Sequence, residues 1–523
     1  MKKYAALLAI ALLASHGGPT LAARSPAKGP VSADEAPAPK DAESVTQGSV
    51  TVGGHAIDYT ATAGTLILRN DRGEPTGSMF YVAYVKSGVK DEGGRPVTFF
   101  YNGGPGSPSM WLHMGAFGPR RVVTTDHAHT PAGDYREVNN EYSLLDVTDE
   151  VFIDAIGTGY SRIIGKSDGG VGVPKDFYGV DADVASYAQF INRYLSKNNR
   201  WNSPKYIYGE SYGTLRSAAL VNYLEQRDST DLNGVILQST VLTHLTNRFW
   251  PNSDLPYEVF LPSYAASAWY HHRLPKQPDA LEPFLEQVQQ FALNDYAEAL
   301  NAGAALSPEQ FSAIAEKLHE YTGLSTGYIE KANLRVTDRQ FFHQLLADRD
   351  ETVGRLDSRF AGPSMDPLSE DAGYDPQEAA ISSAYAAGFN AYVRTTLKFG
   401  AGRVYLFHGS VNPWDMRHVD LVTRRPQGDL TSVAVDLAQA MKHDPDLQVL
   451  AQNGYYDLAT PYFGTVYIMN HLDIPPDLRS HIHMEFYQAG HMIYVNVPEL
   501  KKLHDTTADF IRATENVAGG RQR

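Results

Sequence analysis

Residues 205–220 read KYIYGESYGTLRSAAL, and the change of pattern inside them predicts a sharp turn from a strand into a helix. The KYIY segment carries the aromatic and β-branched residues of a buried strand. Beyond it, small and apolar residues recur on one helical face: Leu215, Ala218, Ala219 and Leu224. The join, Gly209-Glu210-Ser211-Tyr212-Gly213, places Ser211 between two glycines. Such a turn strains its central residue and pushes the side chain outward beside the first amides of the helix, so we predict that Ser211 is a nucleophile.

The same G-x-S-x-G spacing occurs once more, at Gly165-Lys166-Ser167-Asp168-Gly169. This second copy runs into GVGVPKDF, which has the pattern of neither a strand nor a helix. We predict a surface loop there. The spacing alone therefore identifies nothing, and the strand and helix around Ser211 carry the argument.

Composition sets the broad class of the protein. The chain has 523 residues, of which 43% are hydrophobic and 20% charged, as in ordinary globular proteins. This length suits one large domain with insertions, or two domains. A formal charge of −15 and a pI near 5.6 argue against binding to nucleic acid or to anionic membranes. Because the chain has no cysteine, it has neither disulfides nor a lipoprotein anchor.

The first residues have the pattern of a targeting segment. Residues 1–23, MKKYAALLAIALLASHGGPTLAA, place two lysines before an apolar segment and end in small residues, as a secretory signal peptide does. The apolar segment is too short to span a bilayer. Residues 24–45 are rich in Pro, Ala and charge, which predicts a disordered linker. We therefore expect a secreted or periplasmic protein without a membrane anchor.

The order of the remaining segments predicts the fold. Strand-like segments dominate up to about residue 101, and strands then alternate with helices up to residue 244. This order predicts an α/β fold, with a central, mostly parallel sheet covered by helices on both faces. Residues 245–400 change to helices and loops, which predicts an inserted helical cap. Strand-like segments return at VYLF (404–407), LQVLAQ (447–452) and MEFYQ (484–488). We thus expect the α/β core to consist of two parts, 46–244 and 401–523, separated in the sequence by the cap.

A serine hydroxyl needs a base that is held by a third group. In α/β-hydrolase sheets an acid and then a histidine follow the nucleophile, on loops after later strands. Asp457 lies just after LQVLAQ, and His491 lies just after MEFYQ. The rival histidines lie within helical patterns or before a strand, and Asp473 is a less suitable acid. We predict His491 as the base and Asp457 as its orienting partner.

The developing oxyanion needs two backbone amides. The amide of Tyr212 follows the nucleophile directly and is one candidate. The other should come from an earlier loop at a strand end, and PVTFFYNGGPGSPSM provides one, at residues 102–106. Glycines there let bare N–H groups approach a ligand.

Four stretches, NGGPGSPS, GESYGT, NGYYDLATP and AGHMIYVNVPEL, resemble the serine carboxypeptidase family within the α/β-hydrolase superfamily. The segment VFIDAIGTGYSR is similar to the family's segment before the nucleophile. The resemblance implies a catalytic triad of Ser211, His491 and Asp457, and an oxyanion hole of the Gly104 and Tyr212 amides. It also implies that the terminal carboxylate of the substrate is bound by Asn102, Gly103 and Glu210.

The chain departs from the family pattern at one position. Family members carry a second glutamate before a Gly-Pro, and Ala116 stands there in MGAFGPRR. The preference for a free C-terminus could therefore be weaker. Arg120 or Arg121 is an alternative source of charge for a substrate carboxylate, although solvated or structural arginines are the favoured interpretation.

Three functions remain open from the sequence. The leading one is a secreted serine carboxypeptidase that acts on peptides through an acyl-enzyme. The second is an esterase or acyltransferase on the same scaffold, and the remote third is a non-catalytic binding protein. We expect no cofactor and no metal, because the histidine pairs at 127–129 and 481–483 have no obvious third ligand. Oligomeric state and side-chain preference stay open.

Overall fold

The structure, a computed structural model, describes residues 39–133, 135–428 and 431–516. The predicted signal peptide and most of the predicted linker lie outside the described residues. The first strand begins at Ala42, so residues 42–45, which we assigned to the linker, belong to the sheet. None of the described helices combines the length and apolar character needed to cross a membrane.

The described residues form a mixed, ten-stranded central sheet, as the sequence predicts. The strands lie in the order β1-β2-β3-β7-β4-β9-β10-β15-β16, and a short strand pairs with β3 at the side. Neighbours from β1 to β7 are antiparallel, whereas all neighbours from β7 to β16 are parallel. The strands are β1 (Ala42–Val52), β2 (His55–Arg69), β3 (Pro75–Lys86), β4 (Val97–Tyr101), β7 (Asp149–Ile153), β8 (Arg162–Ile163), β9 (Lys205–Glu210), β10 (Gly234–Gln238), β15 (Gln448–Gly454) and β16 (Ile482–Tyr487).

The register of the parallel strands brings their carboxyl ends to one level. Tyr101 of β4 pairs with Gly209 of β9, and Glu210 pairs with Gln238 at the end of β10. The loops after these strands therefore begin side by side. In such sheets this edge is where ligands bind.

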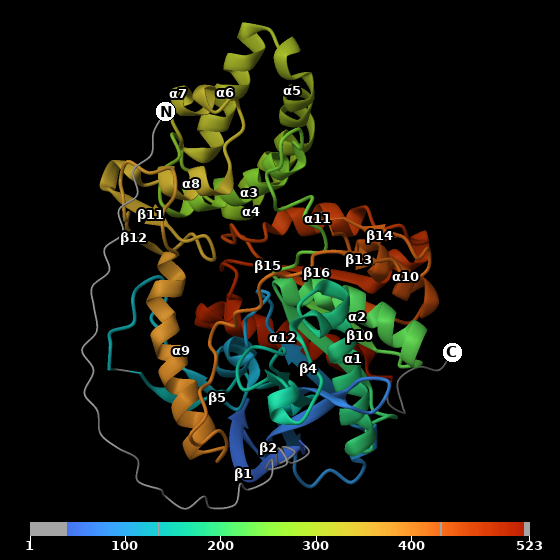
Figure 1. Ribbon diagram of the computed structural model, residues 1–523. Coiled ribbons are helices and arrows are strands. Elements are labelled where there is room, and N and C mark those ends of the chain that lie inside the picture. The colour runs from blue at the N-terminus through green and yellow to red at the C-terminus, as the bar shows by residue number, and fades with distance from the viewer. Residues whose placement is uncertain (1–38, 134, 429–430, 517–523) are drawn as a thin grey trace, which may run out of the picture.

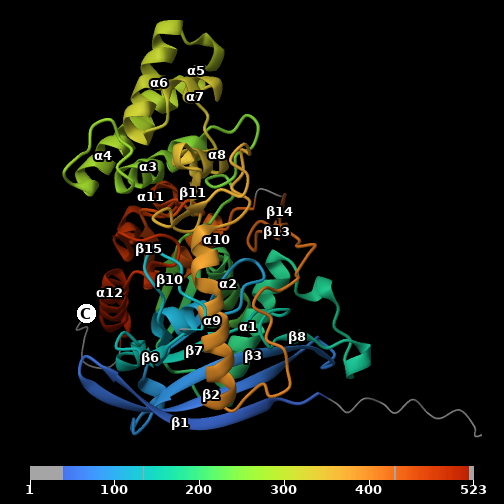
Figure 2. The same ribbon diagram turned by 90° about the vertical axis from the view of Figure 1, so that its left-hand side faces the viewer.

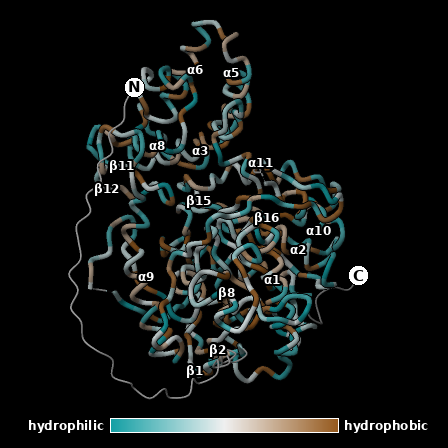
Figure 3. Tube along the Cα trace, viewed as in Figure 1, coloured by the Kyte–Doolittle hydropathy of each residue, from teal (hydrophilic) through white to brown (hydrophobic). Residues whose placement is uncertain are grey.

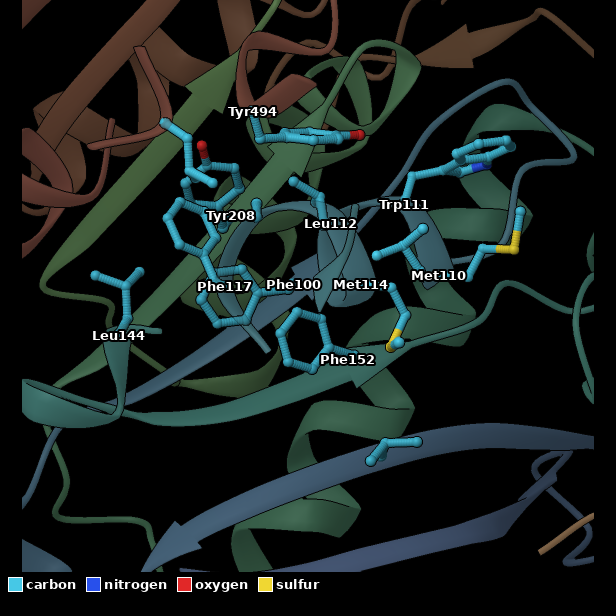
Figure 4. Packing of buried hydrophobic residues seen from close by; sticks show 14 of the residues in the cluster. Phe100, Met110, Trp111, Leu112, Met114, Phe117, Leu144, Phe152, Tyr208 and Tyr494 are labelled. Atoms are coloured by element: carbon cyan, nitrogen blue, oxygen red, sulfur yellow. The ribbon is translucent and has the colours of Figure 1, made fainter. Parts of the chain in front are cut away.

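Helices cover both faces of the sheet, and each face has its own hydrophobic core. On one face the core includes residues from α1 (Val180–Lys197), α2 (Tyr212–Asp228) and α10 (Ala434–His443). On the other it includes α9 (Pro376–Thr395), α12 (Val497–Thr514) and the π-helical turn Leu112–Phe117. Figure 4 shows how Phe117 and its neighbours in this turn gather over Phe100 and Phe152 of the sheet.

A helical unit projects beyond the carboxyl edge of the sheet (Figures 1 and 2). It has a core of its own, which continues into the loop after β15 through Tyr456 and Leu458. Hydrophilic and hydrophobic segments alternate along its outer helices, as expected where only one face is buried (Figure 3). Its elements are α3 (Leu255–Tyr270), α4 (Leu281–Phe291), α5 (Ala297–Ala302), α6 (Pro308–Thr322), α7 (Thr326–Lys331), α8 (Asp338–Gln344), β11 (Glu351–Val353) and β12 (Ala361–Pro363).

Two details differ from the sequence prediction. Helix α9 falls within the predicted cap, yet Ile381, Tyr385 and Phe389 pack into the core of the sheet (Figure 2). The predicted strand 404–407 is not formed, and Leu406 makes a single isolated bridge with Gly159. Tyr405 instead points into the aromatic core, 4.4 Å from the ring of Phe389 between ring centroids. The apolar pattern of residues 404–407 therefore reflects packing against α9 and not a strand of the sheet.

Candidate active site

Ser211 sits at the join of β9 and α2 with φ 61° and ψ −129°, which is strained for a residue with a side chain. Its own N–H donates to the carbonyl of Gln238 at 3.0 Å, which fixes the turn to the neighbouring strand. The flanking glycines are required by space, since a Cβ on Gly209 would lie 2.3 Å from the carbonyl oxygen of Gly213. The turn thus has the geometry expected of a nucleophile elbow.

His491 and Asp457 form a buried pair. Nδ1 of His491 lies 2.7 Å from a carboxylate oxygen of Asp457, so Nε2 is the ring nitrogen that is not engaged by this carboxylate. Asp457 also accepts hydrogen bonds from the amides of Ala459 and Thr460 at 2.7 and 2.9 Å. Burial lowers the pKa of His491, but the charge and the hydrogen bond of Asp457, together with the charge of Glu210, outweigh this effect, and the pKa is raised. The rival Asp473 is exposed and pairs with Lys442.

The glycine loop after β4 rests directly on the first turn of α2. A Cβ on Gly103 would lie 2.4 Å from the amide nitrogen of Tyr212 and 2.6 Å from that of Gly213. Gly104 follows with φ 103°, a conformation that favours glycine. The two loops that should supply the oxyanion amides are therefore in contact.

These loops and His491 line one cleft of about 1060 Å³. Asp457 is fully buried and reaches the cleft through His491. The cleft thus unites three loops that are far apart in the sequence. The predicted site residues that line it are Asn102, Gly103, Gly104, Glu210, Ser211, Tyr212 and His491.

Arg216, one turn into α2, ties the glycine loop to the helix that follows Ser211. Its guanidinium is fully buried, donates to the carbonyl oxygen of Asn102 at 2.9 Å and pairs with Asp183 of α1 at 2.7 Å. The same group lies over the rings of Tyr187 and Tyr212, 4.3 and 5.4 Å from their centroids. Buried charge is tolerated here because every side of the guanidinium has a partner.

Glu210 is buried among amide side chains. It accepts hydrogen bonds from Asn102 Nδ2 at 2.7 Å and from Gln238 Nε2 at 3.0 Å. Burial raises the pKa of Glu210 to about 7, and the charge of His491 limits the rise. The carboxyl group therefore changes its protonation near neutral pH.

Ala116 lies where the family pattern carries a second glutamate, and its surroundings are apolar. It is fully buried in the π-helical turn, within the cluster that contains Phe100 and Tyr208 (Figure 4). Arg120 pairs with Glu137 at 2.6 Å, and neither Arg120 nor Arg121 is among the residues that line the cleft. The alternative that one of these arginines meets the substrate is therefore not supported, and this position agrees with the favoured interpretation of solvated or structural arginines.

Sequence reasoning missed the segment 354–358, which returns from the helical unit and lies between the loops of the triad. The amide of His491 donates to the carbonyl of Leu356 at 2.6 Å, and that of Leu458 donates to the carbonyl of Arg355 at 3.0 Å. The amide of Gly490 donates to the side chain of Asp357 at 3.2 Å. These contacts join residues more than 100 positions apart, so no local sequence signal marks them.

Three arginines that we did not single out also line the cleft, namely Arg248, Arg339 and Arg355. The second G-x-S-x-G copy lies elsewhere, where residues 166–168 form a short 3₁₀ turn. Within the described part of the chain, His, Asp and Glu form no group that could hold a metal ion.

The comparisons with known proteins agree with this geometry. The model of one family, described as serine carboxypeptidase, matches residues 68–491. The chain belongs to the serine carboxypeptidase family. It is thus a serine-type carboxypeptidase, with peptides as its substrate class. No curated protein sequence matches the chain.

Solved structures show the fold of the family. The chain is similar to Kex1(delta)p, a prohormone-processing carboxypeptidase from Saccharomyces cerevisiae. The TM-score is 0.53, and the two sequences are 14% identical over 86% of this chain and 91% of that one. A proline iminopeptidase from Mycobacterium smegmatis aligns with a TM-score of 0.35 and 14% identity over 87% of this chain and 100% of that one. At 14% identity, the likeness to Kex1(delta)p concerns the fold alone.

Proposed function

We propose that this chain is a secreted carboxypeptidase that removes C-terminal residues from peptides through an acyl-enzyme on Ser211. One observation carries the proposal. The His491–Asp457 pair, the strained Ser211 and the Asn102–Glu210 pair all meet at one cleft. A nucleophile with its base and a recognition group for the free terminus are the components that this reaction needs.

The steps follow from the positions of these groups. The hydroxyl oxygen of Ser211 attacks the last peptide carbonyl, while Nε2 of His491 takes its proton. The amides of Gly104 and Tyr212 hold the negative charge that develops on the carbonyl oxygen. His491 then gives the proton to the leaving amine, and the C–N bond breaks. Water, deprotonated by His491, releases the acyl group from Ser211 as a free acid.

Asn102, Gly103 and Glu210 are proposed to recognise the free terminus. A neutral Glu210 donates a hydrogen bond to the substrate carboxylate, whereas an ionised one repels it. The raised pKa of Glu210 keeps a protonated population up to about pH 7. Recognition by a carboxyl group is therefore feasible without the second glutamate that Ala116 replaces.

The test compares N-blocked dipeptides with their C-terminal amides. We expect a kcat/KM at least tenfold higher for the free acids at pH 5–6, since a hydrogen bond to a charged group contributes about 1.5–3 kcal/mol. Equal turnover of acids and amides would refute terminal recognition, and turnover of neither would refute peptidase activity.

Export is proposed from residues 1–23 alone. Two lysines, an apolar segment and small residues form the pattern of a signal peptide. Expression of the full chain, followed by N-terminal sequencing of the protein outside the cytoplasm, tests this. A mature protein that starts after Ala22 or Ala23 supports export, and an intact first residue in the cytoplasm contradicts it.

A further inference from the structure

Arg355 occupies a fixed place beside the catalytic histidine. Its carbonyl oxygen accepts from the amide of Leu458, and the next carbonyl, that of Leu356, accepts from the amide of His491. The backbone of Arg355 is thus held between the loops that carry Asp457 and His491. A side chain that starts from so constrained a position presents its charge to the cleft with little freedom of the main chain.

Arg355 lines the cleft, and among the described residues its guanidinium has one ion-pair contact, which is long. Its side chain is 48% exposed, and its nearest ion-pair contact is with Asp338 at 4.0 Å, the outer limit for such a pair. Its positive charge nevertheless reaches the triad, because it opposes the rise that Asp457 causes in the pKa of His491. Arg355 therefore lines the same cleft as Ser211 and His491, and its ion-pair contact with Asp338 is loose enough to leave the guanidinium available for a ligand.

Two other charged groups of the cleft, Arg339 and Asp375, already have partners. Arg339 pairs with Asp371 at 2.8 Å. The two oxygens of Asp375 accept hydrogen bonds from the backbone amides of Leu356 and Glu378. Arg248 is exposed and lies near His244, whose pKa is lowered mainly by burial and further by the charge of Arg248. Arg355 is the cleft arginine whose carbonyl accepts from the loop that carries Asp457, and whose neighbour Leu356 accepts from the amide of His491.

We propose that Arg355 binds a carboxylate of the substrate at the cleaved residue, and so determines specificity. The proposal rests on the proposed function, because it assigns a recognition group to the same cleft. An arginine fork matches the two oxygens of a carboxylate, and near the scissile bond it supplies the positive charge that Asn102 and Glu210 lack. Two carboxylates fit this chemistry, that of the free C-terminus and that of an acidic side chain on the last residue.

Binding in the Ser211→Ala background tests the proposal without depending on turnover. The four ligands are two N-blocked dipeptides, one that ends in Glu and one that ends in Gln, each prepared as the free acid and as the C-terminal amide. Isothermal titration calorimetry at pH 6 compares Ser211→Ala with Ser211→Ala/Arg355→Met. Arg273→Met serves as the control, since Arg273 pairs with Asp348 in the same helical unit and is not among the cleft-lining residues.

We expect Arg355→Met to weaken binding of the recognised carboxylate by about tenfold, the lower end for a charged hydrogen bond, because the side chain is half exposed. Loss confined to the free acids assigns Arg355 to the C-terminal carboxylate. Loss confined to the Glu peptides assigns it to the side chain. Equal loss for all four ligands, or no loss, overturns the proposal. Arg355→Lys should retain part of the affinity, and thermal melts should show all variants folded.

Failure of the proposed function would look different. If wild-type protein hydrolyses none of the four peptides while the affinities still depend on Arg355, the carboxylate site stands and the peptidase assignment falls. If hydrolysis occurs but Arg355→Met changes no affinity, the reverse holds.

Discussion

At the scale of single residues, Glu210 has the most informative chemistry in the cleft. It is a buried carboxyl group that neighbours the nucleophile in the chain and accepts hydrogen bonds from two amide side chains. Because burial raises its pKa to about 7, its proton state changes within the range of ordinary assays. A group that recognises a carboxylate only when protonated makes substrate affinity depend on pH.

The first prediction concerns this dependence. The ratio of KM for the amide to KM for the free acid should be high at pH 5 and should fall as pH rises through about 7, because ionised Glu210 repels the acid. Glu210→Gln should give a ratio about tenfold lower at pH 5 and flat with pH, since Gln stays neutral and cannot accept both hydrogen bonds. Steady-state kinetics between pH 5 and 8 measure this KM ratio for the wild-type protein and for Glu210→Gln. A mutant ratio that still falls near pH 7 would assign the pH dependence to another group.

The second prediction concerns the triad. Ser211→Ala or His491→Ala should lower kcat by about 10⁶, and the double variant should cost little more, because the groups act as a unit. Ser167→Ala is the matched control, since it removes the serine of the second G-x-S-x-G copy on a 3₁₀ turn. Pre-steady-state and long-time assays of peptide hydrolysis check the values. A loss of only tenfold on Ser211→Ala would mean that another nucleophile operates.

At the scale of elements, helix α2 positions more than the serine at its start. Arg216 lies one turn inside the helix and holds the carbonyl of Asn102, so the glycine loop cannot shift independently of the helix. Asp183 of α1 balances the buried charge. The helix, the loop and α1 therefore hold together the two loops that carry the proposed oxyanion amides.

The third prediction tests this connection. Arg216→Met should lower kcat about 100-fold, because displacement of the loop by about 1 Å misplaces an oxyanion donor. It should also destabilise the fold by about 3–5 kcal/mol, since Asp183 is left buried and unpaired. The control is Arg200→Met, another buried arginine, which pairs with Asp149 at 2.6 Å at the opposite end of the sheet. It should cost less stability, because Asp149 keeps Arg95 as a partner at 2.8 Å, and it should leave kcat unchanged.

Steady-state kinetics of both variants give kcat, and urea unfolding gives the free energy of unfolding. Organophosphonate labelling of Ser211 adds a readout of oxyanion stabilisation that does not depend on a peptide substrate. If both variants lose kcat equally, Arg216 acts only through stability.

Elements with strong local patterns could be predicted from the sequence. The strand and helix around Ser211 were predicted correctly because an apolar strand, two glycines and a helical face follow one another in KYIYGESYGT. The predicted strand 404–407 was wrong because Tyr405 lies in the hydrophobic core and Phe407 packs against it, while Leu406 makes only an isolated bridge.

Only part of the candidate site could be predicted from the sequence. Residues in glycine-marked loops were found, whereas Arg216 and Arg355 were not. The contact of Arg216 with Asn102 and the contacts around Arg355 join distant parts of the chain. Such contacts depend on the packing of whole elements and leave no local pattern.

At the scale of the whole molecule, the segment that returns from the helical unit contacts the loops that carry Asp457 and His491. The segment that returns from the helical unit carries Asp357, a fully buried carboxylate that pairs with Arg359 at 2.6 Å and accepts from the amide of Gly490. Arg359 also reaches Asp126 at 3.2 Å. A Cβ on Gly490 would lie 2.5 Å from the Cα of Asp357, so the two segments are in direct contact beside His491.

The fourth prediction is that Asp357 couples stability to catalysis across this junction. Asp357→Ala leaves Arg359 buried without its main partner and removes the acceptor for Gly490, so it should cost about 3–5 kcal/mol. It should also lower kcat, because the loop that carries His491 loses an anchor. Asp348→Ala is the control, since it breaks an exposed ion pair with Arg273, and such pairs contribute about 0–1 kcal/mol. Urea unfolding gives the stabilities, and hydrogen exchange followed by mass spectrometry reports on residues 488–494. Faster exchange there in Asp357→Ala, with none in the control, is the expected result. If stability falls but exchange in 488–494 is unchanged, Asp357 supports the fold without positioning His491.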